Sequence, residues 1–285
     1  MPIPGVSLVG FMDEAFADAY LQNSCEGAGA TAPDRKQFWT AARNKLGAPS
    51  ANAGHPDIQA LPPTAKPHLR RVEQLNPRFQ QAISKLKWSF KSVEIDPLLC
   101  YQFHVDTDRA QRACSSAKTK PPTPGELLQT CLPLSPAKLR HQVSALGDSG
   151  LFVRSDDLNV RLLDAKAGAT KGETWTATIV WGTATPLVSV VNFGGRYILH
   201  NGYHRAYGLR VAGATHVPCL VLEANAWNDF VDPKSQVFAE ALLNSADPPT
   251  LAHFTQGRAT PVRLRSVTRV IQISLAELGL PDHYQ

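Results

Sequence analysis

The segment TPLVSVVNFGGRYILHNGYHRAYGLRVAGATHVPCLVLE, residues 185–223, decides what the fold of this chain must contain. Two runs rich in β-branched residues flank a Phe-Gly-Gly-Arg turn at 193–196, which predicts a β-hairpin. The run 203–213 predicts a short helix that ends at Gly213, because glycine readily adopts the left-handed conformation that follows a helix. The apolar run 216–223 predicts a further buried strand. Together these signals predict a strand–turn–strand–turn–helix–strand unit.

The turn between the second strand and the helix carries polar residues that are suited to an anion. Asn201 and Gly202 predict the turn itself, and Gly202 lets the backbone approach a ligand closely. The first N–H groups of the following helix have no intrahelical partner, and the positive end of the helix dipole faces the turn. His204 and Arg205 add side-chain donors for phosphate oxygens. The pattern suits an anion site but does not by itself favour one, because many strand–helix turns with no ligand have the same pattern.

The order of these elements also resembles a known family. The matching pieces are Pro186, Gly194-Gly195, Asn201-Gly202, His204-Arg205, Gly213 and Val217-Pro218. In this order the segment resembles the core of the ParB/sulfiredoxin-like superfamily, over roughly residues 185–223. The segment SVEIDPLLCYQ, residues 92–102, resembles the opening strand and the Gln-bearing segment of that family.

The resemblance implies a nucleotide site. In this superfamily the turn before the helix holds nucleotide phosphates, and members use ATP to phosphorylate a sulfinic acid or serine, or bind and hydrolyse CTP. Carried over by position, Asn201, Gly202 and Tyr203 would form the phosphate turn, and His204 and Arg205 would contact the phosphates. ATP or CTP is therefore the expected cofactor, with Mg²⁺ as a possible companion.

Three departures from the family pattern limit which activity the resemblance implies. Tyr203 stands where sulfiredoxins carry their catalytic cysteine, so sulfinic acid reduction is not expected. The sequence shows no helix-turn-helix after the core, so chromosome partitioning is not expected either. His200 stands where kinase-like relatives often carry Asp, and it is interpreted either as a base or neutral hydrogen-bonding group or as a strand-end residue packed beside Tyr203.

Candidate metal ligands lie outside the segment. Glu94 and Asp96 are two residues apart on a predicted strand, so they point to one face and are candidates for magnesium or for a general base. The alternative is a solvated strand face before a turn. The alternating polar residues of FHVDTDR, residues 103–109, are interpreted as a capping cluster at the entry to a loop, with ligands as the alternative.

The remaining chain is interpreted as extensions of an α+β core. Residues 1–85 are expected to be an N-terminal helical and loop region. Residues 86–224 are expected to be the ParB/sulfiredoxin-like core, a small mixed sheet with helices and a proline-rich insertion at 115–136. Residues 225–285 are expected to add a helix and a strand. Helices are predicted within 12–22, 34–47, 77–88, 125–131, 136–146 and 235–246, and strands within 89–95, 174–182 and 262–275.

Composition sets broad limits on function. The chain has 285 residues, a hydrophobic fraction of 43% and a charged fraction of 19%, which are typical of a globular protein. The formal net charge of +5 includes no basic tail, so a nucleic-acid partner is not favoured. Five widely spaced cysteines include no CxxC pair, and no apolar run reaches the ~20 residues of a membrane span. A cytoplasmic protein with no membrane partner is expected.

The leading functional hypothesis is a nucleotide-dependent enzyme that hydrolyses ATP or CTP, or transfers a phosphoryl group to a small-molecule or protein acceptor. His204, Arg205 and His200 are its candidate catalytic residues. The first alternative is a non-catalytic nucleotide- or partner-binding module that has lost its carboxylates. A metal-dependent nuclease is the second alternative.

Overall fold

The computed structural model describes residues 2–48, 52–75, 86–134, 141–145, 150–155, 160–169, 175–183, 187–233 and 235–274. Over these residues the chain is a mixed α+β protein with eight α-helices and four β-sheets. The chain divides into two compact units. The first unit comprises residues 1–135 and 186–266, and the second comprises residues 136–185 and 267–285.

A six-stranded mixed sheet forms the centre of the first unit, in the order β3-β4-β13-β11-β12-β5. Its strands are β3 (Ile58–Ala60), β4 (Lys87–Glu94), β13 (His216–Ala224), β11 (Ser189–Phe193), β12 (Arg196–Asn201) and β5 (Leu99–Cys100). The predicted hairpin is confirmed, because β11 and β12 pair antiparallel around the Gly194-Gly195 turn. The strand β13 returns parallel to β11, and β4 pairs antiparallel with β13.

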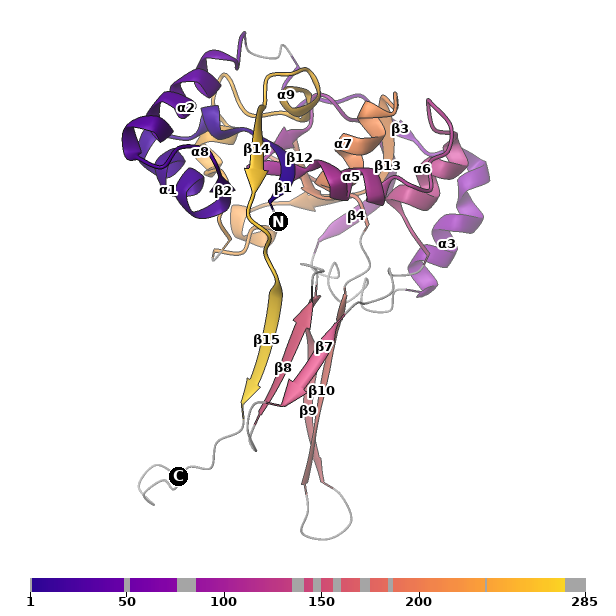
Figure 1. Ribbon diagram of the computed structural model, residues 1–285. Helices are drawn as coiled ribbons and strands as arrows, with labels where there is room; N and C mark the ends of the chain where they lie inside the picture. Colours follow the sequence, from indigo (N-terminus) through magenta and orange to yellow (C-terminus); the bar gives the residue numbers. More distant parts are fainter. Residues whose placement is uncertain are drawn as a thin grey trace. The chain divides into compact units, whose positions relative to one another are not determined.

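A four-stranded antiparallel sheet, in the order β2-β14-β1-β6, completes the strands of the first unit. Its strands are β1 (Ile3–Ser7), β2 (Cys25–Glu26), β6 (His104–Asp106) and β14 (Thr260–Leu264). Figure 1 shows β1 and β14 side by side, although they come from the two ends of the sequence.

The α-helices that the structure describes belong to the first unit. They are α1 (Glu14–Ser24), α2 (Ala32–Asn44), α3 (Lys66–Leu75), α5 (Thr107–Ala113), α6 (Pro124–Cys131), α7 (Tyr203–Val211), α8 (Glu240–Leu243) and α9 (Leu251–Thr255). The helix predicted at 203–213 is confirmed as α7, and Gly213 has the expected positive φ of 97°. The cluster at 103–109 does cap the chain, but at a helix and not at the entry to a loop, since the Asp106 carboxylate accepts a hydrogen bond from the Arg109 N–H at the start of α5.

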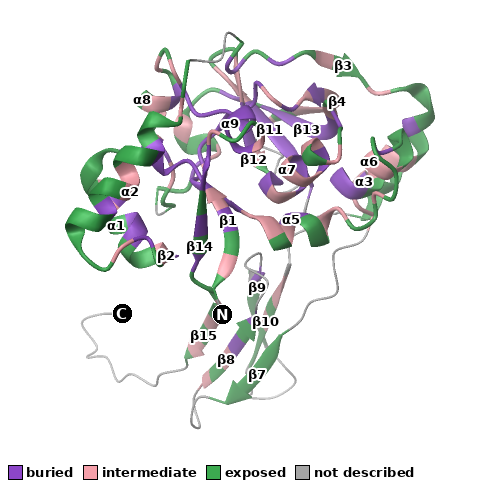
Figure 2. Cartoon of the chain, turned by 45° about the horizontal axis from the view of Figure 1, so that its top comes forward, coloured by how far each residue is buried: buried purple, intermediate pink, exposed green. Residues whose placement is uncertain are grey.

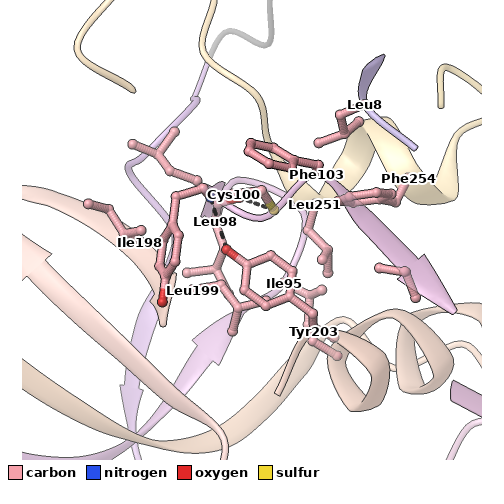
Figure 3. Close-up of a cluster of buried hydrophobic side chains, with 14 of the residues drawn as sticks. Leu8, Ile95, Leu98, Cys100, Phe103, Ile198, Leu199, Tyr203, Leu251 and Phe254 are labelled. Atoms are coloured by element: carbon pink, nitrogen blue, oxygen red, sulfur yellow. Dashed lines mark hydrogen bonds between the residues drawn. The ribbon is translucent and has the colours of Figure 1, made fainter. Parts of the chain in front are cut away.

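The hydrophobic core lies around the central sheet. In Figure 2 the buried residues concentrate in β11, β12, β13 and α7. Figure 3 shows one part of this core, where side chains from β5, β12, α7 and α9 meet. Helix α6 contributes Cys131 and α3 contributes Val72, both fully buried.

The second unit contains only strands among its described residues. A three-stranded sheet has the order β15-β8-β7, and β9 and β10 form a separate hairpin. The strands are β7 (Gln142–Ala145), β8 (Gly150–Ser155), β9 (Val160–Ala169), β10 (Trp175–Thr183) and β15 (Arg269–Ser274). All pairings in the unit are antiparallel.

Several sequence-based predictions of secondary structure are wrong in part. The helix predicted at 136–146 is contradicted at Gln142–Ala145, which pairs with β8 as a strand. The apolar run is short, so its spacing fits both the 3.6-residue period of a helix and the two-residue period of a strand. The single strand predicted at 262–275 is two strands, β14 and β15, in different sheets. The helix predicted at 235–246 shortens to α8, and the N-terminal region contains β1, which pairs with residues more than 95 positions away.

Two further predictions concern the helix at 77–88 and possible membrane spans. Most of the helix predicted at 77–88 lies outside the described residues, and its last two positions belong to β4. Within the described ranges, no helix has both the length and the apolar character needed to cross a bilayer.

Candidate functional site

The turn at the N-terminus of α7 depends on a glycine. Gly202 precedes the helix with a φ of 99°, a left-handed conformation that other residues adopt at a cost. A Cβ atom at this position would also lie 2.8 Å from a side-chain carbon of Val188. Both the conformation and the space therefore require glycine here.

Helix α7 starts without a side-chain cap. Among the described residues, no side chain accepts a hydrogen bond from its first turn, and Asn201 instead donates its Nδ2–H to the carbonyl of Leu187 at 3.0 Å. Asn201 is exposed, and its role is to hold the strand before the turn. The first-turn N–H groups of α7 are thus oriented toward the position that an anion would occupy.

Tyr203 anchors the first turn of α7 in the core. Its side chain is 1% exposed and points into the cluster drawn in Figure 3. Its hydroxyl oxygen accepts a hydrogen bond from the Tyr101 N–H at 3.0 Å. Burial raises the pKa of this phenol well above its usual value. The structure therefore places the Tyr203 side chain in the core, and only its backbone N–H remains available for a phosphate.

His204 lies half-buried beside a group of positive side chains. Burial is the largest cause that lowers its pKa, to about 3, and the charges of Arg109, His104, Arg205 and Arg112 lower it further. The imidazole is consequently neutral at pH 7. The charges that act on His204 are positive, so its surroundings favour a negatively charged ligand.

The arginines of this group come from two helices that pack closely, α5 and α7. A Cβ atom on Gly208 of α7 would lie 2.7 Å from the Cys114 sulfur and 3.0 Å from the Ala110 carbonyl oxygen. Glycine therefore permits the close contact between α5 and α7 that Figure 1 shows. This contact brings Arg109 and Arg112 of α5 next to the N-terminal turn of α7.

Arg205 points away from the turn and holds α6. It is only 8% exposed, and its Nη1 donates to the carbonyl oxygens of Thr130 and Cys131 at 3.2 and 3.4 Å. Burial lowers the pKa of the guanidinium. These carbonyls belong to the last turn of α6, where no intrahelical donor is available. In this structure Arg205 joins two helices, and its assignment as a phosphate contact stays a prediction.

His200 is engaged in two hydrogen bonds. Its Nε2 lies 3.1 Å from the carbonyl oxygen of Phe230, so this nitrogen carries the proton, and its Nδ1 accepts from the Ser189 hydroxyl at 3.1 Å. Burial lowers its pKa, which keeps the ring neutral. His200 also lines a cavity of about 410 Å³ together with Leu86, Leu222 and residues 228–233. The hydrogen-bonding interpretation of this residue describes its geometry better than the interpretation as a free base.

The two candidate metal ligands, Glu94 and Asp96, already have partners. Asp96 forms a bidentate ion pair with Arg210, with N–O distances of 2.8 and 2.9 Å. Glu94 accepts a hydrogen bond from the Asp57 N–H at 3.0 Å. Across the residues that the structure describes, no three His, Cys, Asp or Glu side chains converge on a possible metal position. These residues do not fit a protein-held Mg²⁺ site.

The structure therefore brings together a group of candidate-site residues that the sequence predicted only in part. Asn201, Gly202, Tyr203 and His204 form one turn, whereas Glu94 and Asp96 serve other contacts. Arg109 and Arg112 are new to the candidate site. The sequence analysis predicted no helix at 107–113, and the usable signal was the spacing of three residues between the two arginines, because residues i and i+3 share a helix face. Nothing in the sequence indicated that this face meets α7.

Comparisons with known proteins give no relative. No family model, no curated protein and no solved structure matches the chain.

Proposed function

We propose that this chain is a nucleotide-binding protein of the ParB/sulfiredoxin-like type, and that the nucleotide phosphates bind at the N-terminus of α7 beside α5. The observation that carries the proposal is the coincidence of an uncapped helix start with four positively charged or titratable side chains, His104, Arg109, Arg112 and His204. Phosphate binding usually requires backbone N–H groups and cationic side chains that point toward the same position.

The order of elements supports the same proposal. Strands β11 and β12, helix α7 and strand β13 follow the order on which the resemblance rests. The expected opening strand, β4, lies next to β13, and the backbone of Tyr101 that follows it contacts the first turn of α7. The segment that resembles the family's opening strand therefore contacts the Tyr203 side chain in the core beneath the first turn of α7.

The geometry favours binding over turnover. Both nitrogens of His200 are engaged, and Glu94 and Asp96 have other partners. Among the candidates for catalysis, His204 is the one at the turn whose side chain forms no hydrogen bond with the described residues, and its lowered pKa makes it a weak base in the unbound protein. A binding module is thus our first proposal. ATP or CTP hydrolysis, or phosphoryl transfer with His204 and Arg205 near the phosphates, is the second.

The binding proposal predicts the effect of a charge reversal. Arg112→Glu should weaken nucleotide binding at least tenfold, since it replaces an exposed positive charge near the phosphates with a negative one. The measurement is the thermal shift and the dissociation constant for ATP, CTP, GTP and inorganic phosphate, each with and without Mg²⁺.

The matched control for this measurement is Arg71→Glu. Arg71 is exposed on α3 and is not among the charges that act on His204. Equal affinities for the two variants would show that the phosphates do not bind beside α5 and α7. No thermal shift with any ligand at millimolar concentration would remove the nucleotide proposal. If a ligand does bind, a turnover assay with that ligand distinguishes the binding module from the hydrolase or phosphotransferase.

His204 also predicts a pH dependence of binding. Its pKa is about 3 without ligand, and a bound phosphate must raise it because a negative charge favours the protonated imidazole. Binding therefore takes up a proton at any pH between about 3 and the higher pKa of the complex. Within that window affinity should rise as the pH falls.

The check is the dissociation constant at several pH values from 4 to 8 for the wild type and for His204→Asn, a range that begins just above the pKa of about 3 in the unbound protein. Protonation of the nucleotide itself changes both proteins alike, so the difference between them reports His204. Identical pH profiles would show that the imidazole does not face the phosphates.

A further inference from the structure

Whether Mg²⁺ can join a nucleotide at α7 depends on the carboxylates near its phosphates. In proteins, Mg²⁺ is usually held by the substrate phosphates and by one or two carboxylates. The first candidate, Asp96, engages Arg210 with both of its oxygens, at 2.8 and 2.9 Å. Arg210 lies in the last turn of α7, about 10 Å along the helix axis from Tyr203 at 1.5 Å per residue. Asp96 is therefore committed to the last turn of α7 and not to its first.

The second candidate, Glu94, lies near the same end of the helix. In the strand register Glu94 stands opposite His216, which opens β13 after α7 has ended. The next residue, Ile95, donates its N–H to the carbonyl oxygen of Thr215 at 2.9 Å. The segment that carries Glu94 and Asp96 is thereby fixed to the chain that leaves α7, whereas the proposed phosphate position is where the chain enters α7. Neither carboxylate is placed to hold a metal ion on the phosphates.

Two more carboxylates, Asp106 and Asp108, lie at the start of α5. One oxygen of Asp106 accepts the Arg109 N–H at 2.8 Å and so caps the helix. Burial lowers the pKa of His104, and the charge of Asp106 opposes that shift. Asp108 is exposed, and neither aspartate is among the charges that act on the pKa of His204. Asp106 is therefore the carboxylate whose binding to a metal ion an experiment has to exclude.

The structure supplies positive charge at this turn. Helices α5 and α7 lie side by side in Figures 1 and 2, and Gly208 permits their close contact. The charges of Arg109 and Arg112 both act on His204 in the first turn of α7. Arg112 is exposed, so its guanidinium is accessible to a ligand. Guanidinium groups hydrogen-bond to phosphate oxygens and neutralise their charge, which is also the electrostatic role of a metal ion.

We propose that the site at the N-terminus of α7 binds its nucleotide as the free anion, without Mg²⁺, and that the arginines of α5 take the electrostatic role of the metal. This inference rests on the proposed function and narrows its ligand. A Mg²⁺ ion cancels two negative charges of a triphosphate and keeps several of its water molecules, which would separate the Arg112 guanidinium from the phosphate oxygens. The free anion has neither disadvantage.

The same argument predicts the response of the site to Mg²⁺. The metal and the protein compete for the same phosphate oxygens, so added Mg²⁺ should lower the apparent affinity as it converts free nucleotide into the complex. A site that needs the metal would show the opposite response. The direction of the Mg²⁺ effect therefore distinguishes the two kinds of site.

The test is isothermal titration calorimetry of the full chain with ATP and with CTP at pH 8, where the phosphates are fully ionised. One titration contains EDTA and the other contains saturating MgCl₂, with NaCl added to equalise the ionic strength, because salt alone weakens contacts between charges. We expect the dissociation constant to be lower in EDTA by about tenfold or more. Equal affinity, or tighter binding with Mg²⁺, would overturn this inference and leave the nucleotide site standing. Absence of binding in both titrations would instead overturn the proposed function.

Arg112→Ala tests the residue that replaces the metal. It should weaken binding of the free nucleotide by about fivefold or more and reduce the preference for the free form over the Mg²⁺ complex, since the lost charge acts mainly on the free anion. Arg112→Lys restores the charge and should recover part of both effects. Arg71→Ala removes an exposed arginine from α3 and should leave both unchanged. If the preference in Arg112→Ala equals that of the wild type, Arg112 does not replace the metal.

Asp106→Asn tests the carboxylate nearest to the site's histidines. Asparagine keeps a side-chain acceptor at the N-cap of α5, so the helix start is preserved while the negative charge is lost. We expect the free nucleotide to bind at least as tightly as it binds to the wild type, because a repelling charge has been removed. Weaker binding of the Mg²⁺ complex alone would show that Asp106 holds the metal, and the inference would be wrong.

Discussion

Replacing Arg205 with Ala is expected to lower the free energy of unfolding by about 3 kcal/mol. The buried guanidinium donates to the Thr130 and Cys131 carbonyl oxygens, and hydrogen bonds from a charged donor contribute more than neutral ones. The substitution leaves these carbonyls without their donor and also leaves a cavity where the side chain lay. The measurement is a urea or guanidinium unfolding curve.

Two further variants separate the causes of this loss. Arg205→Met retains most of the side-chain volume and removes only the hydrogen bonds, so it should be less destabilising than Arg205→Ala. Arg112→Ala removes an exposed arginine beside the same turn and should change stability by less than about 0.5 kcal/mol. An unchanged midpoint in Arg205→Ala would show that the contact between α7 and α6 does not stabilise the fold.

Arg205→Ala is a poor test of the nucleotide site. Loss of ligand binding in Arg205→Ala would be expected from the loss of the fold alone, because Arg205 fixes α7 against α6. Arg112 is the better probe, since it is exposed and its change alters the charge near the phosphates without altering the core.

The second large effect is expected at Tyr203. Tyr203→Ala should lower the free energy of unfolding by about 4 kcal/mol, the range observed when a buried aromatic residue becomes alanine. Tyr203→Phe should cost about 2 kcal/mol, because the buried Tyr101 N–H loses its acceptor at 3.0 Å while the ring stays in place. Thermal or denaturant unfolding measures both values.

Tyr207→Phe is the control for the hydroxyl. Tyr207 lies on the same helix and is half-buried. Its substitution should change stability by less than about 0.5 kcal/mol. If Tyr203→Phe were as stable as the wild type, the link between the Tyr101 backbone and the first turn of α7 would not contribute to the fold.

Both residues show why a motif can mislead about individual side chains. Tyr203 and Arg205 belong to the predicted phosphate turn, yet their side chains pack inward. His204, between them on the helix, faces the group of positive charges. On a helix, successive residues are about 100° apart, so a three-residue motif necessarily presents different faces, and only packing decides which face meets a ligand.

The sequence by itself determined the local elements of the central segment. The hairpin at 193–196, the helix from Tyr203 and its end at Gly213 follow from β-branched runs and from glycines at positive φ, which are properties of neighbouring residues. The caps of α5 and α6 are local in the same sense. Such signals act over a few residues, so they are visible without the fold.

Only the tertiary structure decided the composition of the candidate site and the pairing of the distant strands. Arg109 and Arg112 reach the α7 turn because Gly208 lets α5 approach, and β1 pairs with β14 across almost the whole chain. Asp96 meets Arg210 at a separation of 114 residues, which removes it from the candidate metal ligands. These contacts depend on the packing of whole elements against one another, and packing is a property of the folded chain that no local sequence pattern contains.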